Sequence, residues 1–130
     1  MKRIFVLILI GLAVLGCSKD DGEMVESIVG EWNWVKSTGG IADITYTPLT
    51  TGENRELVIS SDSLKHYTNG ELVSKVKYKI EMVHIDDEVL KMIVPEPEEV
   101  IRQFFILEQN RLFLIDDCAD CFISEYKRIK

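Results

Sequence analysis

Polar and apolar residues alternate along several short stretches of the chain. Between Glu71 and Met82 most apolar side chains fall on one parity, while lysine and glutamate side chains fall on the other. Because successive side chains of a β-strand point to opposite faces, this stretch predicts a strand with one face in water. Asn69-Gly70, just before it, favours a tight hairpin, since both residues tolerate positive φ.

The same alternation recurs along the chain and predicts eight short strands. Gln109-Asn110 and Asp86-Asp87 are expected to form two further turns between neighbouring strands. In chain order the predicted strands are 31–37, 56–60, 63–68, one beginning at Glu71, 88–94, 100–108, 111–116 and 122–129.

Some segments do not have a strand pattern. The stretch 39–55 contains Gly39-Gly40 and reads as a long first loop. Pro95-Glu96-Pro97 is also expected to be a loop, because proline cannot donate to a ladder. The nearest candidate for a helix is 96–103, whose acidic start suits a short N-terminal turn.

These elements predict an all-β fold. An antiparallel meander of eight strands hides its edges best by closing into a barrel, so we expect an eight-stranded antiparallel meander barrel. A β-sandwich is the alternative.

The N-terminus has a different character. Lys2 and Arg3 precede an uncharged run of 13 residues that ends at Gly16. At 1.5 Å per residue this run covers about 20 Å, too short for a hydrocarbon core of about 30 Å. A basic start followed by a short apolar run predicts a secretory signal peptide over residues 1–16.

The run closes with Val14-Leu15-Gly16-Cys17, which resembles the lipobox of bacterial lipoproteins. The resemblance implies that Cys17 is acylated and becomes the mature N-terminus, which would anchor the chain to a membrane. An ordinary signal peptide with a free cysteine near its cut is the alternative.

Residues 17–27 are expected to form a lipidated, flexible tether, with the soluble domain at 28–130. Lys19-Asp20-Asp21 resembles the signal that exports many Bacteroidetes lipoproteins to the outer face of the outer membrane; a solvated acidic linker is the alternative. We therefore expect an outer-membrane lipoprotein on the periplasmic or cell-surface side. Loss of Lys2 and Arg3 would leave 13 basic and 22 acidic side chains, and a net charge of −9 argues against nucleic-acid binding.

Short motifs through the domain resemble the lipocalin-like lipoproteins of Bacteroidetes. Gly30-Glu31-Trp32 resembles the Gly-x-Trp motif that opens the first strand of lipocalins. In lipocalins this tryptophan closes one barrel end and a late basic residue packs over it. Arg128 matches that residue best, with Arg111 as the alternative, and the contact would be a cation–π interaction. The other matching residues are Gly39-Gly40, Thr47-Pro48, Asp117-Cys118, and Tyr126 with Arg128.

Cys118-Ala119-Asp120-Cys121 is the sharpest local motif and admits three interpretations. A structural disulfide fits best: if Ala119-Asp120 is a two-residue turn, the cysteines face one another as strand partners in an exported protein. Free or labile thiols are the second interpretation, and a redox or metal site is the third. No helix follows to lower a thiol pKa, and a structural zinc site needs four ligands.

Candidate chemistry elsewhere is sparse. His66 shares parity with Leu64 and is expected to face inward, whereas His84 lies near a strand end and is expected to be exposed. Asp116, Asp117 and Asp120 could in principle suit calcium, but a solvated loop is the simpler interpretation. We therefore predict no catalytic set, no metal, no cofactor and no enzymatic activity.

The aromatic residues permit two functions. Trp34, Tyr78 and Phe105 are candidates to line a pocket for a small apolar ligand; the first two follow from strand parity. The alternative, which we favour, is that the aromatic residues fill the barrel, because eight strands leave little more than room for side chains. The functional expectation is a lipid-anchored barrel that binds a small apolar ligand, or a solid-core interaction or structural protein that acts through its loops.

Overall fold

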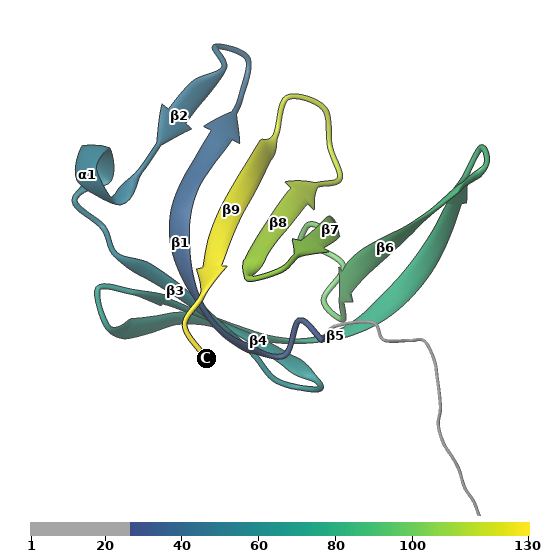
Figure 1. Ribbon diagram of the computed structural model, residues 1–130, viewed down its shortest axis with the longest axis horizontal. Coiled ribbons are helices and arrows are strands. Elements are labelled where there is room, and N and C mark those ends of the chain that lie inside the picture. The colour runs from purple at the N-terminus through teal and green to yellow at the C-terminus, as the bar shows by residue number, and fades with distance from the viewer. Residues whose placement is uncertain (1–26) are drawn as a thin grey trace, which may run out of the picture.

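A computed structural model describes residues 27–130 as one curved β-sheet with a single short helix (Figure 1). The predicted signal peptide, Cys17 and nearly all of the predicted tether lie outside the described residues. The elements are β1 (Gly30–Gly39), β2 (Ile44–Tyr46), α1 (Pro48–Thr51), β3 (Arg55–Ile59), β4 (Ser63–Thr68), β5 (Glu71–Ile85), β6 (Glu88–Pro95), β7 (Gln103–Glu108), β8 (Arg111–Asp116) and β9 (Phe122–Arg128).

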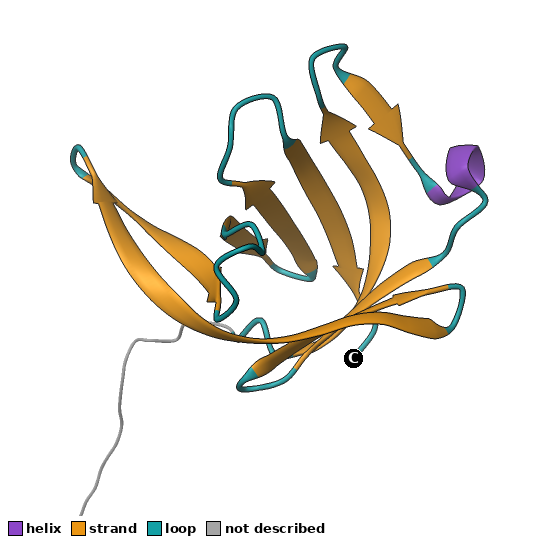
Figure 2. Ribbon diagram, turned by 180° about the vertical axis from the view of Figure 1, so that it is seen from behind, coloured by secondary structure: helices purple, strands orange, loops and turns teal. Residues whose placement is uncertain are grey.

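The sheet closes into an antiparallel barrel of eight strands, as predicted, and the sandwich is excluded. Strands β3 to β9 follow one another in sequence order, and β1 pairs with both β3 and β9 to complete the ring. Strand β2 is an extra strand that pairs with the end of β1. The long hairpin of β5 and β6 projects to one side of the ring (Figure 1 and Figure 2).

The predicted turns are confirmed by backbone geometry. Asn69 and Gly70 both have positive φ, at 51° and 84°, which matches the right-handed twist of the flanking strands. Asp86 and Gln109, the first residues of the other two predicted turns, also have positive φ. Asparagine and aspartate occur at such positions more often than most residues other than glycine.

Three predictions of local structure are wrong. The stretch 39–55 is not a plain loop, because Thr47 caps a helical turn at α1 and β2 precedes it. The segment 96–103 is not helical; bends and a turn lead into β7, which begins at Gln103 rather than 100. Pro95 is not in a loop: it ends β6, opposite Tyr78 of β5. Proline is tolerated there because the ladder between β6 and β7 already stops at Ile93, so the missing N–H removes no hydrogen bond from it.

The core fills the end of the barrel at which β1 begins. Trp32, Leu57 and Leu112 are fully buried, and their indole and isobutyl groups leave little space at this end. The Trp32 indole donates through Nε1 to the carbonyl of Ile28 at 2.9 Å, so its one polar atom is satisfied.

Arg128 lies over Trp32 and closes this end. Its guanidinium carbon is 4.3 Å from the centre of the Trp32 ring. Nη1 and Nη2 donate to the carbonyls of Val29 and Ser27 at 3.1 and 2.9 Å. One planar side chain therefore joins the last strand, the first tryptophan and the chain entering β1. Arg111, the alternative from sequence, instead forms an ion pair with Glu125 at 2.8 Å.

Replacing Arg128 with lysine should weaken the fold. Lysine keeps the charge but cannot stack a planar group on Trp32 while donating to two carbonyls. We expect the free energy of unfolding to fall by about 1–2 kcal/mol in urea denaturation. The matched substitution Arg102→Lys, at an exposed ion pair with Asp117, should cost less than about 0.5 kcal/mol. Equal losses in the two variants would contradict a closing role for Arg128.

Candidate functional site

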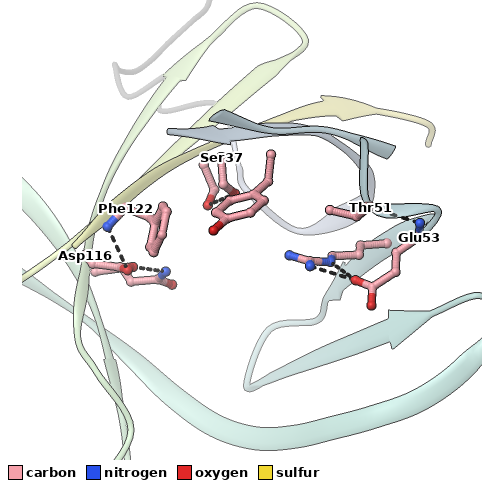
Figure 3. Close-up of a pocket in the computed structure, with 9 residues that line it drawn as sticks. Ser37, Thr51, Glu53, Asp116 and Phe122 are labelled. Carbon is pink, nitrogen blue, oxygen red and sulfur yellow. Dashed lines mark hydrogen bonds and ion pairs between the residues drawn. The ribbon is translucent and has the colours of Figure 1, made fainter. Parts of the chain in front are cut away.

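A pocket of about 520 Å³ lies at the opposite end of the barrel, where β1 and β8 end and β3 and β9 begin. Its walls come from both the barrel and the β2–α1 segment (Figure 3). The lining residues are Ser37, Tyr46, Thr51, Glu53, Arg55, Gln103, Asp116, Phe122 and Ser124.

Strand parity explains why this end is polar. The inward positions of β8 run from Leu112 through Leu114 to Asp116. Those of β9 run in the opposite direction, from Tyr126 to Ser124. Each row therefore starts apolar in the core and ends polar at the open end, which makes the interior dry at one end and hydrophilic at the other.

Asp116 forms one wall of the pocket. Its Oδ1 accepts a hydrogen bond from Nε2 of Gln103 at 2.7 Å, and its Oδ2 accepts one from the backbone N–H of Phe122 at 3.3 Å. Within residues 27–130 its carboxylate makes no ion pair. Both hydrogen bonds hold the carboxylate in place without neutralising it (Figure 3).

Arg55 forms the facing wall together with Glu53. The Arg55 guanidinium lies 4.2 Å from the centre of the Trp34 ring. Its Nε and Nη2 both reach Oε1 of Glu53, at 2.8 and 2.7 Å. Arg55 is therefore held by stacking on one side and by an ion pair on the other.

Two serines form the base of a polar network between these walls. Ser37 Oγ accepts from Nε1 of Trp34 at 2.8 Å and lies 2.6 Å from Oγ of Ser124. Ser37 reaches the interior because the ladder between β1 and β9 shifts between Trp34 and Lys36. A regular period of two would have turned Lys36 inward, whereas Lys36 is exposed.

Tyr126 lies next to the pocket in the core. Burial raises the pKa of its hydroxyl to about 12; the charge of Arg55 acts to lower this pKa and that of Asp116 to raise it. Both charged walls are thus close enough to act on the hydroxyl. Within the described residues this hydroxyl has no hydrogen-bond partner, and Tyr126 is buried, with only 8 % of its surface exposed.

The two cysteines are adjacent to the same end of the barrel. Cys118 and Cys121 are disulfide-bonded, with their Cα atoms 5.6 Å apart. They lie in the loop between β8 and β9 and are not ladder partners, because the strands end at Asp116 and start at Phe122. The bridge lies within the short loop that joins Asp116 to Phe122, two residues that line the pocket.

Gly39 allows this loop to pack closely on β1. Gly39 has φ of 156°, and a Cβ there would clash with the carbonyl of Cys121. The next residue, Gly40, donates its N–H to the same carbonyl at 3.3 Å.

None of the three aromatic residues predicted to line a pocket is among the described residues that line this one. Trp34 and Tyr78 are buried in the core, and Phe105 packs partly buried against it. Trp34 instead supports Arg55, and Tyr78 donates its hydroxyl to the carbonyl of Ser60 at 2.7 Å. Aromatic residues alone do not identify the pocket. Its signal in the sequence is polar residues at inward-facing positions near strand ends, such as Asp116 and Ser124.

The remaining candidates form no second site. His66 pairs with buried Leu57 on the inward face of β4, and burial lowers its pKa; His84 is exposed. Among residues 27–130 no three histidine, cysteine or acidic side chains gather to hold a metal.

No protein-family model, curated protein or solved structure matches the chain. In the described part of the chain, no helix is long and apolar enough to cross a membrane. The resemblance to lipocalin-like lipoproteins therefore stays a prediction, while the barrel is established.

Tyr126 should give a late step in an alkaline titration. Because its folded pKa is raised above the value of about 10 for an unfolded tyrosine, its contribution to stability is fully present below pH 10 and is lost as the pH rises through 12. Ultraviolet absorbance should record tyrosinate forming near pH 12 in the folded protein. If a Tyr126→Phe variant keeps this step unchanged, the step comes from another tyrosine and the assignment to Tyr126 is wrong.

Proposed function

We propose that this chain is a lipid-anchored binding module of the cell envelope, whose barrel takes one small molecule at its open end. The pocket carries the proposal. Its volume of about 520 Å³ lies in the range of small-molecule sites, about 300–1,000 Å³. Convergent polar groups on a rigid barrel are what such sites use to orient a ligand.

The chemistry of the lining favours a ligand with polar groups over the purely apolar one expected from sequence. Asp116, Ser124 and Arg55 present charge or hydroxyl groups, whereas Tyr46 and Phe122 supply the apolar surface. An apolar molecule would remove water from these polar groups without replacing their hydrogen bonds, which is unfavourable.

The position of residue 27 is compatible with a membrane tether. Ser27 meets Arg128 at the closed end of the barrel, away from the pocket. A tether attached there would leave the open end accessible. With the resemblance of Val14 to Cys17 to a lipobox, this supports attachment through an acylated Cys17 to the outer membrane, on its periplasmic or cell-surface side.

An interaction protein is the second candidate, and one observation favours it. Ile41 and Leu49, both in the segment between β1 and β3, are 91 % and 92 % exposed. Two apolar side chains in water near the open end would suit contact with another macromolecule.

Filling the pocket tests the binding module. All strands, the core and the pocket lie within residues 27–130, so a form starting at Ser18 keeps the whole fold. Purified from a bacterial periplasm, this form should carry a small molecule in native mass spectrometry. Ser124→Phe, which places a ring in the pocket, should lose it.

The matched control is Ser61→Phe, at an exposed turn between β3 and β4, which should keep the bound molecule. A protein that is bare in all three forms, or Ser124→Phe retaining its ligand, would favour the interaction protein.

Lipidation has its own test. When the full chain is made in bacteria fed an alkyne-labelled fatty acid, we expect label on the protein and its recovery in the membrane fraction. Cys17→Ala should abolish both, because no other cysteine lies at the lipobox. Label that persists in Cys17→Ala would rule out this anchor.

A further inference from the structure

The pocket has one negative charge without a counter-charge. Of its lining residues only Glu53, Arg55 and Asp116 carry a formal charge, and the first two neutralise each other at 2.7 Å. Asp116 lies on the other wall, across the pocket from Glu53 (Figure 3). Its two hydrogen-bond donors, Gln103 Nε2 and the Phe122 N–H, are both neutral.

Asp116 still has acceptor capacity. An ionised carboxylate has about four lone-pair sites, and the structure uses two of them. Asp116 lines the pocket, so a donor that enters it can reach the unused sites. A cationic donor would form a charge-assisted hydrogen bond, roughly twice as strong as a neutral one.

Aromatic rings lie next to this carboxylate. Phe122 and Tyr46 line the same pocket, with ring centroids 5.9 Å apart and a tilt of 54°. Phe122 is tied to Asp116 through its own backbone N–H. Ring faces attract cations, and they also offer apolar surface to the body of an organic molecule.

We propose that the pocket binds a protonated organic amine, with its ammonium group on Asp116 and its carbon skeleton against Phe122 and Tyr46. This inference rests on the proposed function, because it names the chemical class of the small molecule. The serine hydroxyls of Ser37 and Ser124 offer further acceptors for ammonium protons.

An anionic ligand fits these contacts less well. Arg55 already holds Glu53 through two nitrogens, so an incoming anion would have to displace that carboxylate. Displacement would leave Glu53 unpaired in a pocket that already holds a second negative charge, Asp116, on the opposite wall. Pairing the free carboxylate with a cation requires no existing contact to break.

Three probes of similar size separate charge from shape. Phenethylamine, phenethyl alcohol and phenylpropanoate share a phenyl ring and a short chain, but at neutral pH they are cationic, neutral and anionic. Titration of each into the form starting at Ser18, followed by ¹H–¹⁵N NMR, gives its affinity and the amides that shift. We expect the amine to bind at least tenfold more tightly than the alcohol, with the largest shifts at Asp116, Phe122 and Ser124.

Two variants test the assignment of charge. Asp116→Asn should lower the affinity for the amine about tenfold and leave that for the alcohol within about twofold. Glu53→Gln removes the charge that pairs with Arg55 and should raise the affinity for phenylpropanoate while weakening that for the amine. Asp87→Asn, the same substitution at the β5–β6 turn, should change nothing.

The outcomes separate the two proposals. Equal binding of all three probes, or preference for phenylpropanoate in the unmodified protein, would overturn the amine while leaving a small-molecule pocket in place. If none of the probes binds, the amine proposal is also overturned. Whether the barrel binds a small molecule at all is then decided by the separate test, the loss of a co-purified ligand in Ser124→Phe. Tight amine binding that survives Asp116→Asn would reject the carboxylate as the recognition group.

Discussion

The pairing of β1 with β9 is the constraint on which the rest of the structure depends. It joins the first strand to the last, and Trp32 opposite Arg128 fixes its register at one end. Without this ladder the sheet would have two open edges and its inward side chains would face water. Closure converts one row of alternating side chains into a core around Leu57 and Leu112, and it brings residues almost a hundred positions apart into contact.

The same ladder also divides the interior. Its shift between Trp34 and Lys36 turns Ser37 inward and leaves the lysine outside. The irregularity therefore places a neutral hydroxyl, which bonds to Trp34 and Ser124, in the wall of the pocket and keeps the lysine charge out of it. At the other end, where the ladder is regular, Arg128 and Trp32 close the barrel. One strand pair therefore sets a stable closed end and an open polar end.

Much of the fold could be predicted from sequence because strand alternation and turn residues are local signals. Asn69-Gly70 and the parity of Glu71 to Met82 were sufficient to place the β4–β5 hairpin. The β2–α1 segment could not be predicted, because β2 has three residues and depends on its partner β1. The pocket was missed for a similar reason: a bulge cannot be recognised from parity, and Asp116 and Arg55 face each other only after the barrel closes.

The barrel is apolar inside at the end that Trp32 closes and polar at the open end, where Asp116 lines the pocket. A crystal structure of the form starting at Ser18 tests this most directly. We expect ordered water or a bound small molecule in contact with Asp116 in the pocket, and none around Trp32. An open end in which Phe122 fills the space, or in which Arg55 has moved from Glu53 to Asp116, would contradict it.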